Sequence, residues 1–598
     1  MSKIMKREEV DDKYKWDLTK IYSSDEEIAK DMKLVKEKAN DLLKYKGKLT
    51  SSSDNLLKAT DDYFDLMRIM DKLIVYAHMK SDEDKSVAKS EELVGKIDRL
   101  SDEISELLAF YSPELLGNDY ELVEKYISEN DGLKKYDFMF KDLFREKDHI
   151  LSLEQEEMMA RLGEVFSVSE NAFRMLDDVN MKFGFIKDED GKKQELTGTN
   201  YSTYLKSRDR RVRRDAFESL YNAYNDFKQT YAALLKGNVK SNFFVSNTRK
   251  YNSPLDMSLY SDNIDKKLYY SLIEKVHNNL DIMEDYMKLR KEILGLDEVH
   301  MYDVYAPLVD NISKKFTYEE AKELVLKALE PLGETYINDL KSIFESGCID
   351  VYNNKGKRSG AYSWGSYDTL PYVLLNFEGK FTDVSTVAHE LGHSMHSFYS
   401  HKYQEYHDSG YPIFLAEIAS TVNEIFLNRY CSIHAETKGE KAYYLNNLLE
   451  NFRTTLIRQT MFAEFELKIH DLEESGEVLT EELLCDTYLD LNKKYFTDAA
   501  VSDDLIKLEW ARIPHFYTSF YVYKYATGIS VACRIVSDIL DKKEGALDNY
   551  MKFLSSGGND FPLEILRKTG IDIANDNTID KALEIFRETL KEFKEIIS

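Results

Sequence analysis

The sequence contains few of the residues that interrupt helices, with only 8 Pro and 25 Gly among 598 residues. Proline removes a helical hydrogen bond and glycine costs conformational entropy, so their scarcity favours a mainly α-helical protein. No apolar run approaches the roughly 18 residues that a membrane-spanning helix needs. The N-terminal sequence MSKIMKREEVDDKYKW is charged throughout and shows no apolar core of a signal peptide. We therefore expect a cytoplasmic protein with no membrane partner.

Cysteine is also scarce, and acidic residues outnumber basic ones. The four cysteines form no CxxC pair, so we expect isolated thiols instead of a disulfide framework or a zinc knuckle. The chain has 81 Lys+Arg against 108 Asp+Glu, which gives a net charge of −27 and argues against a nucleic acid or an anionic membrane as partner.

The composition and length allow a large folded body. Hydrophobic residues make up 43% of the chain and charged residues 32%, so a sizeable core is expected and disorder is excluded for most of the sequence. At about 150 residues per domain, the chain allows two to four domains or one large helical body with lobes. Apolar residues at three- and four-residue spacing predict helices in segments 23–48, 53–81, 86–112 and 119–181.

Apolar residues on both sides of an acidic glycine turn predict a hairpin over 182–196. We place a domain boundary there, which divides the chain into an N-terminal helical domain, 1–199, and a second domain, 200–598. The basic cluster at 208–214 is typical of a solvated, salt-bridged helix face in an acidic protein.

The second domain combines helices with a few short strands. Helical patterns occupy 202–248, 264–294 and 317–346, and helical sequence returns at about 382 and continues to the end. Between them, short β-branched or aromatic runs separated by Gly, Lys and Asn predict a small sheet, at 349–352, 360–364 and 371–377.

One motif carries recognisable chemistry. His389-Glu390-Leu391-Gly392-His393 is an HExxH sequence. On a helix, residues at i and i+4 lie on one face, so the two imidazoles can converge on one zinc ion, and the adjacent Glu390 can take a proton from a water molecule on that zinc. Chance alone gives such a motif in roughly two or three of a hundred proteins of this composition. The motif therefore needs support from its surroundings.

A third histidine does not supply that support. A metzincin needs a glycine at position 396 and a histidine at position 399 in this numbering, and the chain has His396 and Tyr399 there instead, which excludes that class. His396 lies on the same helical face as His389 but about 10 Å away along the axis, too far to share one metal with both other histidines. We therefore expect His396 to pack against the site or to support it.

A carboxylate further along the chain is a better candidate for the third ligand. Glu417 lies 24 residues after His393, between small and apolar residues of a predicted helix. A buried carboxylate needs a partner, and a zinc ion beside two histidines would be one, giving a His2Glu site. An ordinary buried salt bridge is the alternative. Glu424, seven residues later, could orient His389 or His393 through its second ring nitrogen.

The sequence HELGHSMHSFYS, followed by Glu417 in EIASTVNE, resembles the oligoendopeptidase F branch of the thimet oligopeptidase family. Three further stretches agree with this branch: GKRSGAYSWGSYDTLPYVLLNF at 356–377, ARIPHFYTSFYVYKYATGIS at 511–530 and SSGGNDFPLEILRKTGIDI at 555–573. The resemblance is strong from about 200 to 590 and looser in the N-terminal third.

This resemblance implies a zinc-dependent endopeptidase that hydrolyses short, unfolded peptides and spares folded proteins. It implies a mainly α fold, two-lobed, with a deep substrate channel and a small β-sheet beside the HExxH helix. Carried onto this chain, His389, His393 and Glu417 bind one Zn²⁺, and Glu390 is the general base. The strand 371–377 would offer its backbone edge to an extended peptide, with 360–362 bordering the same groove.

The family also implies donors for the oxyanion that forms during peptide hydrolysis. It places a histidine and following tyrosines in the segment 515–525, which points to His515, with Tyr521 and Tyr525 at helical i, i+4 spacing, as catalytic residues. The tyrosine register does not match the thimet branch without a one-residue shift, so Tyr517 and Tyr523 stay open.

Two rival functions remain at this stage. A non-catalytic helical protein could sequester peptides, but it would not need a general base such as Glu390 beside the metal. A zinc carboxypeptidase would need a charged group that recognises the substrate C-terminus, and no residue in the sequence identifies itself as one. The sequence does not indicate cleavage preference or oligomeric state.

Overall fold

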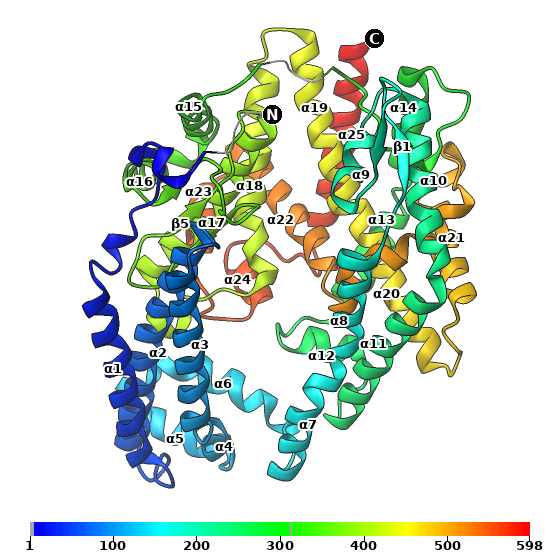
Figure 1. Ribbon diagram of the computed structural model, residues 1–598. Coiled ribbons are helices and arrows are strands. Elements are labelled where there is room, and N and C mark those ends of the chain that lie inside the picture. The colour runs from blue at the N-terminus through cyan, green and yellow to red at the C-terminus, as the bar shows by residue number, and fades with distance from the viewer. Residues whose placement is uncertain (1–4, 311–313) are drawn as a thin grey trace. The chain divides into compact units, whose positions relative to one another are not determined.

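The computed structural model describes residues 5–310 and 314–598, and helices dominate it (Figure 1). This confirms the predicted mainly α fold. The chain divides into two compact units. Unit 1 consists of Met1–Lys147, Lys314–Leu427 and Ile535–Gly570, and unit 2 of Asp148–Ser313, Asn428–Arg534 and Ile571–Ser598. Since each unit is built from three separate segments, neither follows a single stretch of sequence, and the expected division at 199/200 stays a prediction.

The helices of unit 1 are α1 (Asp25–Leu42), α2 (Ser53–Asp82), α3 (Ala88–Leu108), α4 (Tyr111–Leu116), α5 (Tyr120–Glu129), α6 (Asp137–Arg145), α15 (Tyr318–Ala328), α16 (Gly333–Glu345), α17 (Phe381–Tyr403), α23 (Ala546–Leu554) and α24 (Pro562–Lys568). Those of unit 2 are α7 (Leu153–Phe166), α8 (Val168–Arg174), α9 (Gly198–Leu205), α10 (Arg210–Asp226), α11 (Lys228–Thr248), α12 (Pro254–Tyr260), α13 (Lys266–His277), α14 (Asp281–Leu294), α19 (Lys438–Asn451), α20 (Arg458–Glu474), α21 (Glu481–Phe496) and α25 (Thr578–Ile597). The division between the units falls inside α18 (Ile413–Ile433) and α22 (Tyr523–Leu540).

The first three predicted helices are present as α1, α2 and α3, which lie side by side (Figure 1). They meet over apolar residues that are fully buried, among them Val35, Leu66 and Ile97. Because these side chains recur at helical spacing, burying them on one face stabilises the packed helices. No helix in the described parts of the chain is both long enough and apolar enough to cross a membrane.

The predicted hairpin and the basic cluster both lie in unit 2. Strands β1 (Phe185–Lys187) and β2 (Lys193–Glu195) pair antiparallel, as the acidic glycine turn predicts. The basic cluster begins α10 and is salt-bridged as expected, but it is not wholly solvated. Arg213 is 3% exposed, and its guanidinium lies 2.7 Å from the fully buried carboxylate of Asp303. Arg210 binds the same carboxylate, so one buried charge has two partners.

The predicted small sheet lies beside α17 in unit 1 and has the order β3-β5-β4. Strand β3 (Ile349–Asp350) is parallel to β5 (Tyr372–Leu374), and β4 (Tyr362–Trp364) is antiparallel to it. β5 is therefore the central strand and is buried along its length. The expectation that 371–377 offers its edge to a peptide is wrong, because β3 and β4 already occupy both edges. The outer edge beside α17 belongs to β4.

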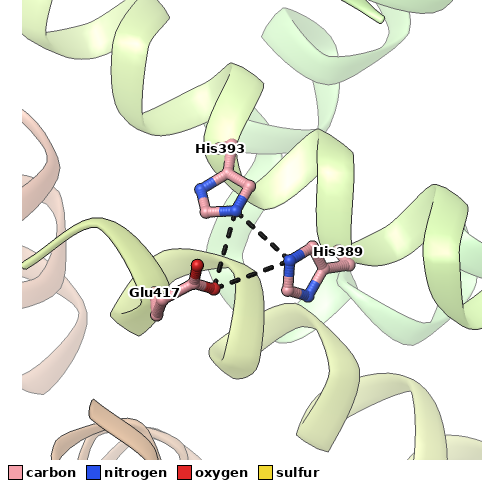
Figure 2. Close-up of side chains that lie close together, drawn as sticks. All are labelled: His389, His393 and Glu417. Atoms are coloured by element: carbon pink, nitrogen blue, oxygen red, sulfur yellow. Dashed lines mark hydrogen bonds and ion pairs between the residues drawn. The ribbon is translucent and has the colours of Figure 1, made fainter. Parts of the chain in front are cut away.

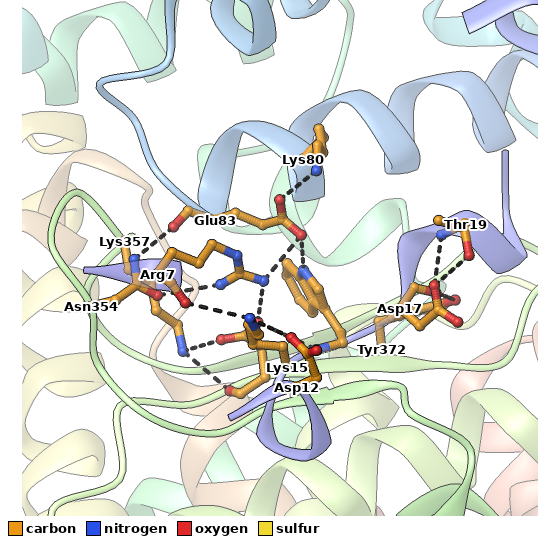
Figure 3. Close-up of polar contacts among 12 residues, drawn as sticks. Arg7, Asp12, Lys15, Asp17, Thr19, Lys80, Glu83, Asn354, Lys357 and Tyr372 are labelled. Atoms are coloured by element: carbon orange, nitrogen blue, oxygen red, sulfur yellow. Dashed lines mark hydrogen bonds and ion pairs between the residues drawn. The ribbon is translucent and has the colours of Figure 1, made fainter. Parts of the chain in front are cut away.

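The N-terminal segment is anchored to this sheet by charged side chains (Figure 3). Arg7 lies 2.6 Å from a carboxylate oxygen of Asp350 in β3 and 3.1 Å from one of Glu83. The second oxygen of Asp350 lies 2.6 Å from the amine of Lys357, which is fully buried. Trp16 donates its indole N–H to Glu83 at 2.9 Å. Because each buried charge has an opposite partner, this cluster fixes β3, and through it the sheet, without unpaired charges.

Candidate active site

The HExxH sequence lies in the middle of α17. Asp383 caps the start of this helix by accepting hydrogen bonds from the backbone N–H groups of Glu378 and Lys380, each at 2.9 Å. His389 and His393 are four residues apart and occupy one face, and their Nε2 atoms are 3.2 Å apart. The helix therefore places two imidazole nitrogens close enough to share one metal ion.

Glu417, near the start of α18, completes a group of three donors (Figure 2). Its Oε2 atom lies 3.6 Å from Nε2 of His389 and 3.7 Å from Nε2 of His393. Figure 2 shows the three side chains pointing toward one another, and their donor atoms all lie within 4.8 Å. Within the described residues Glu417 forms no ion pair with a lysine or arginine, so the alternative of an ordinary salt bridge finds no partner.

A glycine allows α17 and α18 to approach this closely. A Cβ atom at Gly392 would lie 2.5 Å from Cα of Ser420 and 2.6 Å from the backbone oxygen of Ala419. Both distances are far below van der Waals contact, so only glycine fits at this position. Asn423 of α18 also links the two helices, because its side-chain N–H donates a hydrogen bond to the backbone oxygen of Ala388 in α17 at 3.0 Å. The central glycine of HELGH thus sets the distance between the histidines and Glu417.

Glu424 lies behind the first histidine, with its Oε1 atom 2.9 Å from Nδ1 of His389. Burial acts to lower the pKa of His389, but the hydrogen bond and charge of Glu424 outweigh it and raise the pKa to about 9. Burial and the neighbouring charge of His389 lower the pKa of His393 to about 4. The cluster thus stabilises one positive charge among the two imidazoles. A metal cation between the rings would supply that charge while both imidazoles stay neutral.

Glu390 is 7% exposed and lies beside the first histidine in sequence. Burial is the main cause that raises its pKa to about 7; the charge of His389 opposes this, and Glu417 and Glu424 add to it. The backbone N–H of Ser363 in β4 donates a hydrogen bond to the Glu390 carboxylate. This amide fixes the carboxylate against the edge of the sheet.

Two serines link β4 to α17, and sequence reasoning missed both of them. The hydroxyl of Ser363 lies 2.8 Å from that of Ser394, which also donates to the backbone oxygen of Glu390 at 2.9 Å. No local signal marks these residues, because a serine inside a helix or strand is common without a functional role. Their link holds the strand that contacts Glu390.

Of the three residues expected to border the peptide groove, 360–362, the first two line a cavity and Tyr362 does not. The cavity has a volume of about 230 Å³, and its other walls are residues that follow β5 and the first turns of α17: Leu375, Asn376, Phe377, Asp383 and Thr386. This cavity therefore lies between the sheet and the helix that carries the histidines.

His396 does not join the metal ligands. It is fully buried, and its ring stacks on that of Tyr411 at 3.7 Å and lies 5.0 Å from that of Phe553. Neither ring nitrogen has a hydrogen-bond partner in the described residues, and burial lowers its pKa to about 3. His396 is thus a neutral packing residue, one of the two roles expected for it.

The predicted oxyanion donors His515, Tyr521 and Tyr525 form a cluster of rings in unit 2. The ring centroid of His515 lies 6.1 Å from that of Tyr521 and 6.0 Å from that of Tyr525, and the centroids of the two tyrosine rings are 5.4 Å apart. All three side chains are partly exposed. Tyr521 precedes α22 and does not share that helix with Tyr525, so the expected i, i+4 helical spacing of the tyrosines is wrong.

The two tyrosines that the sequence left open are buried instead. Tyr517 stacks on Phe173 at 4.5 Å, and Tyr523 is 1% exposed and packs against Tyr269. The loop between them is held by Phe520, which has a positive φ of 60° and donates its backbone N–H to Glu466 at 2.9 Å. This loop geometry separates Tyr521 from its buried neighbours.

Two family models and several known proteins match this chain. The family model "Peptidase family M3" matches residues 203–585, and the model "Oligopeptidase F" matches residues 114–183. Oligopeptidase PepF of Bacillus subtilis is 42% identical over 99% of this chain and 88% of its own length. Group B oligopeptidase PepB of Streptococcus agalactiae is 38% identical over 99% of this chain and 98% of its own length.

Solved structures show the same relationship. A structure from Chlamydophila abortus matches with a TM-score of 0.93 and 37% identity, covering 99% of this chain and all of the other. Oligoendopeptidase F from Enterococcus faecium matches with a TM-score of 0.74 and 33% identity, covering 96% of this chain and 99% of the other. The chain therefore belongs to peptidase family M3, in its oligoendopeptidase F group, and is a metalloendopeptidase that acts on oligopeptides.

Proposed function

We propose that this protein is a zinc-dependent endopeptidase that cleaves short, unfolded peptides, with His389, His393 and Glu417 as ligands of one Zn²⁺ and Glu390 as general base. The observation that carries the proposal is the convergence of these three donors from two helices, with donor atoms within 4.8 Å of one another. Glu390 stands beside them, and a protein that only bound peptides would not need it there.

The donor set suits zinc. Two imidazole nitrogens and one carboxylate oxygen form a common catalytic zinc site, which leaves the fourth position open. With bonds of about 2.0–2.1 Å, a tetrahedral ion separates its donors by about 3.3 Å, and the three separations here are 3.2, 3.6 and 3.7 Å. When bound, zinc supplies a Lewis acid that activates water and polarises the peptide carbonyl.

Within this site Glu390 moves the proton. Its carboxylate takes a proton from the attacking water and later delivers it to the nitrogen that leaves. The hydrogen bond from the backbone N–H of Ser363 holds one side of the carboxylate. Because Ser394 ties Ser363 to α17, the base keeps its position while the proton is transferred.

The outer edge of β4 is the proposed binding edge for the peptide. Val373 directs its N–H to β3, where it donates to the backbone oxygen of Cys348 at 2.9 Å. Val373 is the β5 residue opposite Ser363 of β4, so this pair forms no hydrogen bonds between the two strands. The residues on either side of Ser363, Tyr362 and Trp364, exchange the hydrogen bonds with β5, and the backbone groups of Ser363 face outward. An extended peptide that adds to this edge would pass the Glu390 carboxylate, and its scissile bond would lie beside the metal site.

The rings of His515, Tyr521 and Tyr525 are the proposed donors to the oxyanion. Their partial exposure supports this role, because a donor must reach the substrate, whereas Tyr517 and Tyr523 are buried. An N–H or O–H group aimed at a developing negative charge stabilises the transition state more than the ground state.

The experiment that tests this function is mass-spectrometric mapping of cleavage in a ladder of peptides of increasing length, each tested both unblocked and blocked at both ends, with and without chelator. We expect internal cuts in short peptides, an upper length limit, and loss of all products with chelator that added Zn²⁺ restores. Removal of C-terminal residues alone, and only from unblocked peptides, would instead identify a carboxypeptidase. Undiminished cleavage after complete metal removal would refute the zinc mechanism.

A further inference from the structure

A second cavity in unit 1, of about 420 Å³, begins where the edge strand β4 ends. Trp364, the last residue of β4, lines it together with Gly365, Ser366 and Tyr367. Helix α2 forms another wall. The cavity contains none of the proposed metal ligands, so the metal site does not account for it.

The cavity holds a carboxylate that has no cationic partner. Asp71 of α2 is partly buried and accepts a hydrogen bond from the hydroxyl of Tyr406, and among the described residues it pairs with no lysine or arginine. Burial raises its pKa, and the bond from Tyr406 opposes that effect. A carboxylate in such surroundings is costly unless a cation joins it.

Two further polar groups in this cavity lack partners. Ser366 is only 4% exposed, and its Oγ atom has no hydrogen-bond partner in the described residues. The Nδ1 atom of His401 is also buried without a partner. Unpaired buried polar atoms are rare in native proteins, so Ser366 and His401 have hydrogen-bonding capacity left for a ligand that enters the cavity.

The walls favour an organic cation. Phe64, Trp364, Tyr367 and Tyr406 present aromatic rings to the cavity, and aromatic faces attract cations. The nearby Arg68 does not fill this role, because it lies over the ring of Tyr367 and is paired with Asp368.

We propose that this cavity is a subsite for the side chain of a lysine or arginine in a bound peptide, with Asp71 as its counter-ion. The inference rests on the proposed peptidase function and adds to it a substrate preference. Ser366 and His401 would bind the donor groups of the guanidinium or ammonium that Asp71 leaves free.

The position of the cavity predicts which residue of the peptide places its side chain there. His401 follows His393 by eight residues on α17, which is about 12 Å along the helix axis. An extended peptide advances about 3.3 Å per residue, and a basic side chain is itself long. The residue in the subsite therefore lies about two to three positions from the cleaved bond.

The test compares arginine with citrulline, which has nearly the same shape without the charge, at each position of a quenched nonapeptide. We expect kcat/KM for arginine to exceed that for citrulline about tenfold at one position. Asp71→Asn should reduce this ratio to about one, and Asp71→Glu should keep most of it. Asp62→Asn is the matched control, because Asp62 also lies on α2 and accepts a tyrosine hydroxyl, from Tyr45, but does not line the cavity. The ratio of kcat/KM for arginine to that for citrulline should be the same in Asp62→Asn as in the wild type.

Binding separates this proposal from the peptidase function. With Glu390→Gln protein, fluorescence anisotropy should show the same preference for arginine without any turnover, and the double variant with Asp71→Asn should lose it. Equal binding of both peptides at every position, or a preference that survives Asp71→Asn in protein with an unchanged urea midpoint, would overturn the subsite. A preference that disappears when the peptide's N-terminus is acetylated would also overturn it, by identifying an α-amino group as the occupant. Turnover by Glu390→Gln at the wild-type rate, with a preserved binding preference, would instead refute only the catalytic mechanism.

Discussion

Nδ1 of His389 lies 2.9 Å from a carboxylate oxygen of Glu424, while Nε2 of the same ring faces His393 and Glu417. One ring thus connects a supporting carboxylate on one side to the proposed metal position on the other. Such a carboxylate fixes the orientation of the imidazole and increases its basicity as a ligand. Glu417 and Glu424 therefore have different roles although both lie on α18: Glu417 faces the proposed metal position, and Glu424 supports His389.

Glu424→Gln should lower the affinity for zinc about 10- to 100-fold, because the charge that supports His389 is lost while a hydrogen-bond acceptor stays. Competition with a chelator of known affinity measures this change, and excess Zn²⁺ should restore hydrolysis. Glu378→Gln is a control, since Glu378 forms an exposed ion pair with Lys380. Equal zinc affinities of the wild type and Glu424→Gln would show that Glu424 does not support the site.

Gly392→Ala should separate α17 from α18, because its Cβ would lie 2.5 Å from Cα of Ser420. We expect a loss of about 1–3 kcal/mol in the free energy of unfolding from overpacking, together with weaker zinc binding as Glu417 moves away. Gly95→Ala is the matched control within helix α3, where nothing lies within 4 Å of the added atom. It should be neutral or stabilise by up to about 1 kcal/mol. Unchanged zinc affinity in Gly392→Ala would contradict this role of the glycine.

Glu450 in unit 2 should make stability depend on pH. Burial acts to raise its pKa, but Arg453 and Arg290 outweigh that effect and lower the pKa to about 2. Since its pKa in an unfolded chain is about 4.3, the carboxylate stabilises the fold fully at higher pH, and this contribution is lost as the pH falls from about 4.5 toward 2. Glu450→Gln should therefore lower the free energy of unfolding by about 3–5 kcal/mol at pH 7, with a smaller difference at pH 3.

Urea unfolding at both pH values measures this effect. Glu284→Gln, which removes an exposed ion pair with Lys288, should change the free energy by less than about 0.5 kcal/mol. An equal loss for Glu450→Gln at pH 7 and pH 3 would show that the buried arginines do not hold its carboxylate in the charged form.

Tyr521→Phe and Tyr525→Phe should each lower kcat roughly tenfold or more with little change in KM, if their hydroxyls act on the oxyanion. Tyr517→Phe tests the alternative register. Because Tyr517 is buried against Phe173, its variant should keep the wild-type kcat. Steady-state kinetics on one peptide compares all three variants. A drop in kcat confined to Tyr517→Phe would move the donor to that residue.

Local patterns were sufficient to predict much of the fold. Apolar residues at helical spacing predicted α1, α2 and α3, and the acidic glycine turn predicted the β1–β2 hairpin. The HExxH spacing is also local, so it placed His389 and His393 on one face of a helix. Glu417 lies on the next α-helix along the chain, and its apolar neighbours predicted a buried carboxylate that needs a partner. Its carboxylate does face the histidines, but its side chain is 32% exposed and not buried.

What the sequence could not predict depends on contacts between distant segments. The order of strands in the sheet follows from pairing between residues far apart, so the central place of β5 was missed. The bond from Ser363 to Glu390 and the close approach of Gly392 to α18 have the same origin. Arg213 looked like part of a solvated face because its buried partner, Asp303, is 90 residues away. Helical periodicity also put Tyr521 and Tyr525 on one helix, whereas α22 begins between them, at Tyr523.

The most direct test of the central claim is a zinc titration of metal-free protein in which bound zinc and hydrolysis of one quenched nonapeptide are measured together. For the wild type, we expect activity to rise in proportion to bound zinc and to level off at one equivalent. Glu390→Gln should bind the same amount of zinc and stay inactive, and Glu417→Ala should neither bind zinc tightly nor hydrolyse the peptide. Full activity of the metal-free wild type, or turnover by Glu390→Gln at the wild-type rate, would contradict the account.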